Sequence, residues 1–243
     1  MEIIQNIIEY YDELYPISEA QKNFYRELTN LYQDPAKLLR VGCGTGFFEH
    51  LLAREGKDVT GIEDFPELLR SANLRRRNQL MSIRFFQMSY LDMVRFLGKG
   101  FYNIISILED RITSIHDRTL LRKFFFDSKQ LLCKDGSLVI GMYNYDKFKD
   151  STKFDLPARE SLRTKLFSSI GIRDDGQAIL KQSVETGSGK LLPVTQDKPV
   201  YLLHTKEIEL FAKEAGFKNI NFYADYSKTP FTGEQDSFIA LIS

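Results

Sequence analysis

A short strand that ends in a run of alternate glycines constrains the fold of this 243-residue chain more than any other feature. Residues 38–41 are typical of a buried strand, and Gly42, Gly44 and Gly46 follow directly. A helix is expected over 47–54, so its unpaired N–H groups and positive dipole end face the same turn. Because glycine accepts positive φ angles and has no Cβ, a ligand can approach this backbone closely. The pattern predicts a nucleotide-cofactor loop at the carboxyl end of a strand.

The glycine spacing separates two classes of cofactor. The dinucleotide fingerprint is G-x-G-x-x-G, in which two residues precede the third glycine. Here the spacing is G-x-G-x-G, and Phe47 stands where a dinucleotide-binding fold would have its third glycine. A nicotinamide-dependent oxidoreductase is therefore the less favoured alternative, and binding of NAD would identify it.

The loop resembles motif I of the class I S-adenosylmethionine-dependent methyltransferases, an apolar strand that ends in D-x-G-x-G-x-G. The second predicted strand, 58–62, ends in Glu63 and Asp64. The resemblance implies that Glu63 binds the ribose hydroxyls of the cofactor. From the residues alone, a simpler interpretation stays open, in which the two acids cap the next helix.

The resemblance extends to the C-terminus and implies the fold of that family. Strands are expected over 82–87, 102–107, 134–142, 220–223 and 237–242, with helices over 65–80, 117–132 and 207–215. We therefore expect an α/β fold: a Rossmann-like seven-stranded methyltransferase sheet with an antiparallel last strand, an N-terminal helical cap and a small β-rich insertion after strand five. One domain is expected, made of the cap (1–36), a cofactor-binding core (37–144), the insertion (145–203) and a C-terminal helix with strands six and seven (204–243).

The insertion interrupts the strand–helix alternation of the core. Strands are expected over 176–185 and 190–194 around the turn Thr186-Gly187-Ser188-Gly189, and a further one over 199–204. Its place after strand five puts it beside the ligand-binding edge of an open α/β sheet. We expect a substrate cap there; the alternative is a passive hairpin that supports a dimer.

S-adenosylmethionine is the cofactor that the resemblance implies. Tyr11-Asp12 and Tyr15 are similar to a tyrosine pattern of small-molecule methyltransferases, which implies that Tyr11 reaches the carboxylate end of the cofactor; packing within an amphipathic helix is the alternative. The residues expected to bind the cofactor are Tyr11, Gly42, Cys43, Gly44, Thr45, Gly46, Glu63, Asp64, Ser89, Tyr90 and Leu108.

Three positions depart from the pattern of the family. The acidic residue that usually stands two positions before the first glycine is Arg40, the adenine-site Asp is Ser89, and the usual Asp of strand four is Asn103. These departures leave a second hypothesis, a non-catalytic cofactor-sensing or partner-binding protein on the same fold. Backbone contacts and shape can still hold the cofactor, so we favour an active enzyme.

The implied reaction moves a methyl group from a sulfonium to a nitrogen or oxygen of a small-molecule acceptor. A positioned base can assist the loss of the acceptor's proton, although many members of the family need none. Candidates at the expected edge of the sheet are Glu109, Asp110, His116 and Tyr143, with Asn144 available to orient the acceptor.

Charge and cysteine content narrow the partners and the compartment. The 33 basic and 33 acidic residues cancel, which gives no electrostatic footprint for nucleic acid. There is no long apolar stretch for a membrane span and no signal pattern at the N-terminus. The two cysteines, Cys43 and Cys133, have no metal-ligand spacing. We expect a cytoplasmic monomer or homodimer with a small-molecule acceptor, no metal, no membrane and no nucleic-acid partner.

Overall fold

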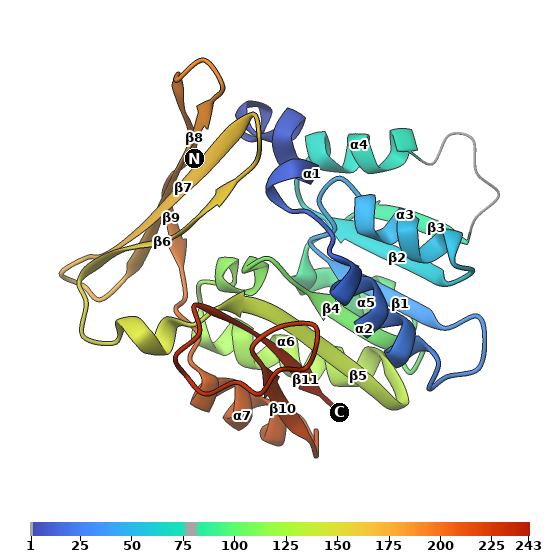
Figure 1. Ribbon diagram of the computed structural model, residues 1–243. Helices are drawn as coiled ribbons and strands as arrows, with labels where there is room; N and C mark the ends of the chain where they lie inside the picture. Colours follow the sequence, from blue (N-terminus) through green and yellow to red (C-terminus); the bar gives the residue numbers. More distant parts are fainter. Residues whose placement is uncertain (1, 76–81) are drawn as a thin grey trace.

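A twisted seven-stranded sheet forms the centre of the computed structural model, which describes residues 2–75 and 82–243 (Figure 1). The strand order is β10-β11-β5-β4-β1-β2-β3, and only β11 runs antiparallel to its neighbours. This arrangement confirms the expected methyltransferase sheet with its antiparallel last strand. The strands are β1 (Lys37–Val41), β2 (Asp58–Glu63), β3 (Ile83–Gln87), β4 (Tyr102–Ile107), β5 (Leu132–Tyr143), β10 (Ile220–Tyr223) and β11 (Ser237–Ile242).

Helices cover both faces of this sheet because its central strands are apolar on both sides. Leu38 packs with α2 (Glu19–Thr29), α3 (Phe47–Arg54) and α4 (Pro66–Arg75), whereas the next residue, Leu39, packs with α6 (Arg118–Leu131) and α7 (Thr205–Glu214). The short α5 (Met93–Phe96) lies beside α6. The end of the helix predicted over 65–80 lies outside the described residues.

The insertion is a second, four-stranded antiparallel sheet that stands away from the first (Figure 1). Its strands are β6 (Lys153–Glu160), β7 (Thr164–Ile172), β8 (Ala178–Thr186) and β9 (Leu191–Val200). The sequence predicts β8 and part of β9, but neither β6 nor β7. The prediction of a separate strand over 199–204 is wrong, because β9 ends at Val200. The amide of Tyr201 donates to the carbonyl of Thr113 at 2.9 Å instead of to a strand partner.

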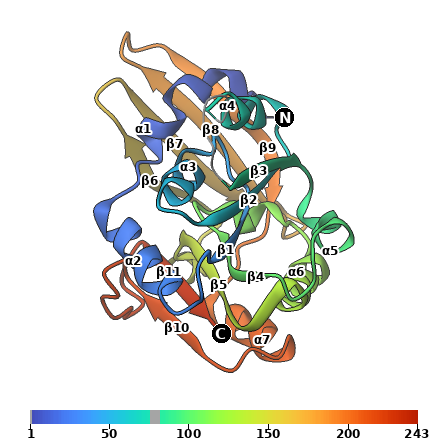
Figure 2. The ribbon, with the colours of Figure 1, turned by 90° about the vertical axis from the view of Figure 1, so that its right-hand side faces the viewer.

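The N-terminal segment crosses from one sheet to the other. It contains η1 (Ile4–Asn6), η2 (Ile8–Tyr10) and α1 (Tyr11–Leu14), and it lies between the four-stranded sheet and α4 (Figure 2). The amide of Ile3 donates to the carbonyl of Val194 at 2.7 Å. Ile7 is buried in a cluster that includes Leu166 and Val194. The segment therefore joins the insertion to the glycine loop side of the core.

Within the described part of the chain, no helix is long and apolar enough to cross a membrane.

Candidate active site

The glycine loop follows β1 and has the backbone that its sequence predicts. Gly42, Gly44 and Gly46 all have positive φ, between 57° and 71°, which residues with a Cβ rarely adopt. A Cβ on Gly44 would lie 2.6 Å from the ring of Tyr11. Glycine is thus required here both by the backbone angle and by the closeness of Tyr11.

Glu63 ends β2 with its side chain turned under this loop. The residue is only 2 % exposed. One carboxylate oxygen accepts from the Gly44 amide at 2.8 Å, and the other accepts from the Asp64 and Phe65 amides at 3.0 and 3.2 Å. The guanidinium of Arg111 lies 3.5 Å from the first oxygen and donates to the Tyr11 hydroxyl at 2.9 Å. Three backbone N–H groups and one guanidinium therefore surround this carboxylate beside the loop.

A cavity of about 230 Å³ opens at this carboxylate. Its polar wall includes Gly42, Glu63, Asp64 and Arg111, and burial raises the pKa of the Asp64 carboxyl. Two 3-10 helices, η4 (Tyr90–Asp92) and η5 (Arg111–Ser114), border the cavity. Its apolar wall comes from these helices, the residues beside them and the ends of β2, β3 and β4: Ile62, Met88, Tyr90, Ile107 and Ile115. An apolar slot beside a carboxylate and a glycine loop matches the chemistry of an adenosine.

The remaining residues expected to bind the cofactor do not line this cavity, although Ser89 stands between Met88 and Tyr90, which do. Cys43, Thr45 and Leu108 are buried, and the Thr45 hydroxyl bonds Asp12. The Ser89 hydroxyl accepts from the Leu91 amide at 3.3 Å and so caps η4.

Two further cavities, of about 80 and 330 Å³, lie between the core and the insertion. The smaller one reaches the glycine loop through Tyr11 and Arg111, which lie against Gly44 and Gly42. Five residues line both cavities, and we refer to them as the acceptor cluster: Tyr15, Glu109, Asp110, Tyr143 and Arg159. The cluster gathers two carboxylates, one guanidinium and two phenol rings from the residue after α1, from β5 and β6, and from the turn after β4.

Glu109 and Asp110 form a strained turn where β4 ends. Both have positive φ, 55° and 64°, which costs free energy in residues with a Cβ and is concentrated at functional sites. The Asp110 carboxylate accepts from the Tyr145 hydroxyl at 2.5 Å and from the Tyr143 amide at 3.1 Å. Withdrawal from water raises the pKa of Asp110 to about 6, although these hydrogen bonds oppose the shift.

Arg40, one of the departures from the family pattern, lies behind this turn. Its guanidinium is buried and lies 3.0 Å from Glu109 and 3.5 Å from Glu49. Burial raises the pKa of the Glu49 carboxyl to about 7, and the charge of Arg40 limits the rise. Arg40 thus gives Glu109 a cationic partner on the side away from the cavities.

The structure separates the other sequence candidates from the acceptor cluster. His116 is exposed and lines a cavity with Tyr201 and His204. The Asn144 amide is buried and donates to the carbonyls of Gly233 and Gln235, so it fixes a loop. Asn103 lies at the start of β4, far along the strand from the glycine loop, and accepts from the Lys37 amide at 2.8 Å.

Sequence reasoning missed Arg111 and Arg159, although both line these cavities. Arg111 follows directly after the acidic pair at the end of a predicted strand, which is a signal that could have found it. Arg159 carries no such signal, because it belongs to a strand that the sequence did not predict.

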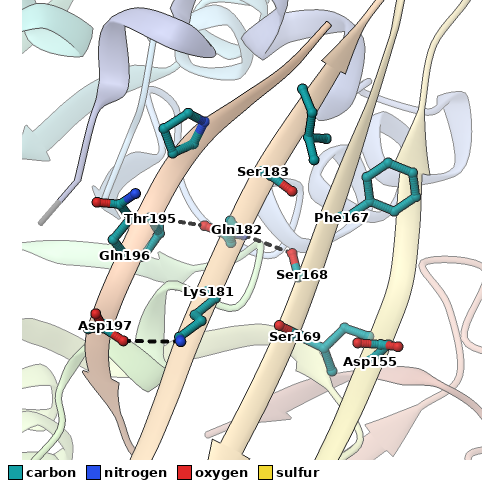
Figure 3. Close-up of a pocket in the computed structure, with 13 residues that line it drawn as sticks. Asp155, Phe167, Ser168, Ser169, Lys181, Gln182, Ser183, Thr195, Gln196 and Asp197 are labelled. Carbon is teal, nitrogen blue, oxygen red and sulfur yellow. Dashed lines mark hydrogen bonds and ion pairs between the residues drawn. The ribbon is translucent and has the colours of Figure 1, made fainter. Parts of the chain in front are cut away.

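A larger cavity of about 740 Å³ lies on the four-stranded sheet (Figure 3). There the Gln182 amide donates to Ser168 at 2.9 Å and accepts from Thr195 at 2.8 Å, and Lys181 pairs with Asp197. Ser168, Gln182 and Thr195 also line the 80 Å³ cavity. The hydrogen-bonded row is therefore the wall between the insertion's own cavity and the acceptor cluster.

Comparison with known proteins agrees with this geometry. The profile of the methyltransferase domain family matches residues 39–140. A glycine/sarcosine N-methyltransferase of Halorhodospira halochloris is 25% identical over 98% of this chain and 87% of its own. A protein of Geobacillus sp. (strain WCH70) that is described as a methyltransferase is 28% identical over 128 residues, and the chain spans only 51% of its length.

A solved structure with the same fold covers the whole chain. The S-adenosylmethionine-dependent methyltransferase of Clostridium acetobutylicum aligns with a TM-score of 0.78 at 17% identity, over 98% of both chains. Strand order and glycine loop define the class I methyltransferase fold. The family match and the relatives together support an S-adenosylmethionine-dependent methyltransferase, with S-adenosylmethionine as its cofactor. Among the residues that the structure describes, no group of three His, Cys, Asp or Glu side chains is placed to hold a metal ion.

Proposed function

We propose that the protein transfers the methyl group of S-adenosylmethionine to the amino nitrogen of a small molecule held by the acceptor cluster. The observation that carries the proposal is the position of two carboxylates, Glu109 and Asp110, in two cavities, the smaller of which reaches the glycine loop through Tyr11 and Arg111. The name of the Halorhodospira relative, an N-methyltransferase, favours nitrogen over oxygen.

The chain offers a fitting group for each part of the cofactor. We assign Glu63 to the ribose hydroxyls, the apolar wall of the 230 Å³ cavity to the adenine, and Arg111 with Tyr11 to the charged amino-acid tail. When bound, S-adenosylmethionine supplies a methyl group on a positively charged sulfur, which an in-line nucleophile displaces.

The acceptor cluster provides what such a nucleophile needs. The two carboxylates can hold an amine by hydrogen bonds and orient its lone pair. With a pKa of about 6, Asp110 is mostly ionised at neutral pH and can accept the proton that the nitrogen releases. The insertion closes this side of the site, so we assign it the role of substrate cap. Both cysteines are free, which supports a reducing cytoplasm as the compartment.

The test begins with calorimetric titration of S-adenosylhomocysteine into the protein and into Glu63→Gln, with NAD as the negative control. We expect the substitution to weaken binding by at least about tenfold, because it removes a charged acceptor from the site. Glu234→Gln, an exposed loop position, is the matched control and should bind as the unaltered protein does. Equal affinity in Glu63→Gln would refute the ribose role. Mass spectrometry of a panel of amines incubated with S-adenosylmethionine then tests methyl transfer itself.

A further inference from the structure

Arg159 stands out in the acceptor cluster because its guanidinium forms no ion pair with a carboxylate of the described residues. The residue is half-buried, and its guanidinium lies 4.6 Å from the ring centre of Tyr15 and 5.4 Å from that of Tyr143. Among the described residues, no carboxylate lies within 4 Å of it. Arg163, four residues further on, is by contrast paired with Glu13.

The backbone of β6 explains how this side chain reaches the cavity. The pairing of β6 with β7 shifts register between Leu156 and Arg159, and Pro157 lies within the shift. Such an irregularity re-aims the side chains that follow it. The Tyr143 hydroxyl donates to the Pro157 carbonyl at 3.3 Å and ties the shifted segment to the end of β5.

Stacked rings connect Arg159 to the glycine loop. Tyr11 lies directly on Gly44, its ring centre is 4.7 Å from that of Tyr15, and Tyr15 carries the guanidinium of Arg159 on its face. Aromatic faces hold a guanidinium by its plane and leave its edge of N–H donors free. That edge matches a carboxylate, which it binds with two parallel hydrogen bonds.

The charges of the cluster are therefore arranged for a zwitterion. The carboxylates of Glu109 and Asp110 share both cavities with Arg159 but form no ion pair with it. Glu109 is instead bound from behind by Arg40 at 3.0 Å. An acceptor with an amine at one end and a carboxylate at the other would satisfy both sides, whereas a neutral amine would leave a half-buried cation without a partner.

We propose that Arg159 binds the carboxylate of the methyl acceptor, so that the substrates are amino acids or close analogues rather than neutral amines. The inference rests on the proposed N-methyl transfer and adds a specificity-determining residue to it.

Paired substrates test the inference on the unaltered protein. Initial rates are measured for a panel of amino acids, including glycine and sarcosine, and for the corresponding carboxamides, which keep the amine and lack the negative charge. We expect kcat/KM for the best acid to exceed that of its amide by at least about tenfold. Amides that react as fast as the acids, or a panel in which only neutral amines react, would overturn the inference.

Variants then assign the effect to Arg159. In Arg159→Gln we expect KM for the acid to rise at least about tenfold, KM for the amide to stay unchanged, and Arg159→Lys to recover part of the loss. Lys153→Gln, an exposed position on the same strand, removes the same charge as a control. An equal rise in KM for acid and amide would contradict the assignment.

A third readout separates this inference from the proposed function. Affinity for S-adenosylhomocysteine should be the same in Arg159→Gln and in the unaltered protein, which also shows that the variant is folded. If the unaltered protein does not bind S-adenosylhomocysteine, the proposed function fails. If it binds and methylates only neutral amines, the proposed function stands and the role of Arg159 fails.

Discussion

At the scale of single residues, Glu63 and the two arginines of the cavities reach their positions in different ways. Glycines at alternate positions and an acid about 20 residues later are local patterns with one structural meaning. Arg111 and Arg159 gain their importance only from the side chains that the fold brings beside them. A charged residue in a polar segment usually indicates a solvated surface, so Arg159 has no local signal, whereas Arg111 has one in the acidic pair that precedes it.

The exchange of an acid for Arg40 has a clear physical outcome in the structure. A buried cation needs buried anions, and Glu49 and Glu109 supply them from α3 and from the turn after β4. The departure therefore changes the charge behind the loop without removing any side chain from the cavity at Glu63.

This buried group predicts a pH dependence of stability. The pKa of Glu49 is about 7 in the folded protein, whereas the ordinary pKa of a glutamate is 4.5. Between pH 4.5 and pH 7 the folded state therefore binds more protons than the unfolded state does. The free energy of unfolding should then fall as pH rises from about 4.5 to about 7, by on the order of 3 kcal/mol from this group. Asp110, with its pKa raised from 3.8 to about 6, acts in the same direction.

Urea unfolding at a series of pH values measures the effect. Glu49→Gln cannot ionise, so its free energy of unfolding should decline less steeply over the same range. Glu234→Gln serves again as the exposed control and should follow the unaltered protein. Parallel curves for Glu49→Gln and the unaltered protein would contradict the assignment.

At the scale of elements, the core strands were predictable and the insertion was only partly so. The strands of the large sheet are apolar runs bounded by turn residues, and the observed bounds agree within a few residues. The sequence of β6, Lys-Phe-Asp-Leu-Pro-Ala-Arg-Glu, has four charges and a proline, which argue against a strand. It pairs on one side only, as the edge of its sheet, where such residues are tolerated.

The N-terminal segment is the element that joins the insertion to the glycine loop, and we expect it to open independently of the core. Ile7 packs in a small cluster with Leu166, Val184 and Val194, apart from the two large clusters. In Ile7→Ala, amide hydrogens of the segment and of β9 should exchange faster, because the substitution leaves a local cavity.

Hydrogen exchange followed by mass spectrometry resolves this prediction by peptide. Peptides from β1, β4 and β5 are internal controls and should exchange as they do in the unaltered protein. Faster exchange throughout the large sheet would mean that the segment belongs to the global folding unit.

At the scale of the whole molecule, the two sheets share one hydrophobic core although they stand apart in the ribbon (Figure 1). Leu156, Ile170, Ala178 and Val200 of the small sheet belong to the same buried cluster as the strands and helices of the large one. Because removal of either sheet would expose part of that cluster, we expect both to unfold together.

Thermal unfolding tests this cooperation with two probes. The chain has 12 tyrosines and no tryptophan, and several tyrosines lie between the sheets. Tyrosine fluorescence therefore reports on the contact between the two sheets, and far-ultraviolet circular dichroism reports on the secondary structure of the backbone. The two curves should coincide. An earlier transition in fluorescence alone would show that the insertion detaches first.

The pairing of Arg111 with Glu63 has a consequence for the kinetics of the enzyme. A ligand that takes Glu63 for its ribose has to displace this guanidinium from a carboxylate that already has four donors around it. Binding is then an exchange of partners, and the apparent affinity equals the intrinsic affinity multiplied by the fraction of molecules in which Arg111 has moved aside. The observed rate of association should accordingly reach a plateau at high cofactor concentration, and the plateau equals the rate at which Arg111 dissociates from Glu63.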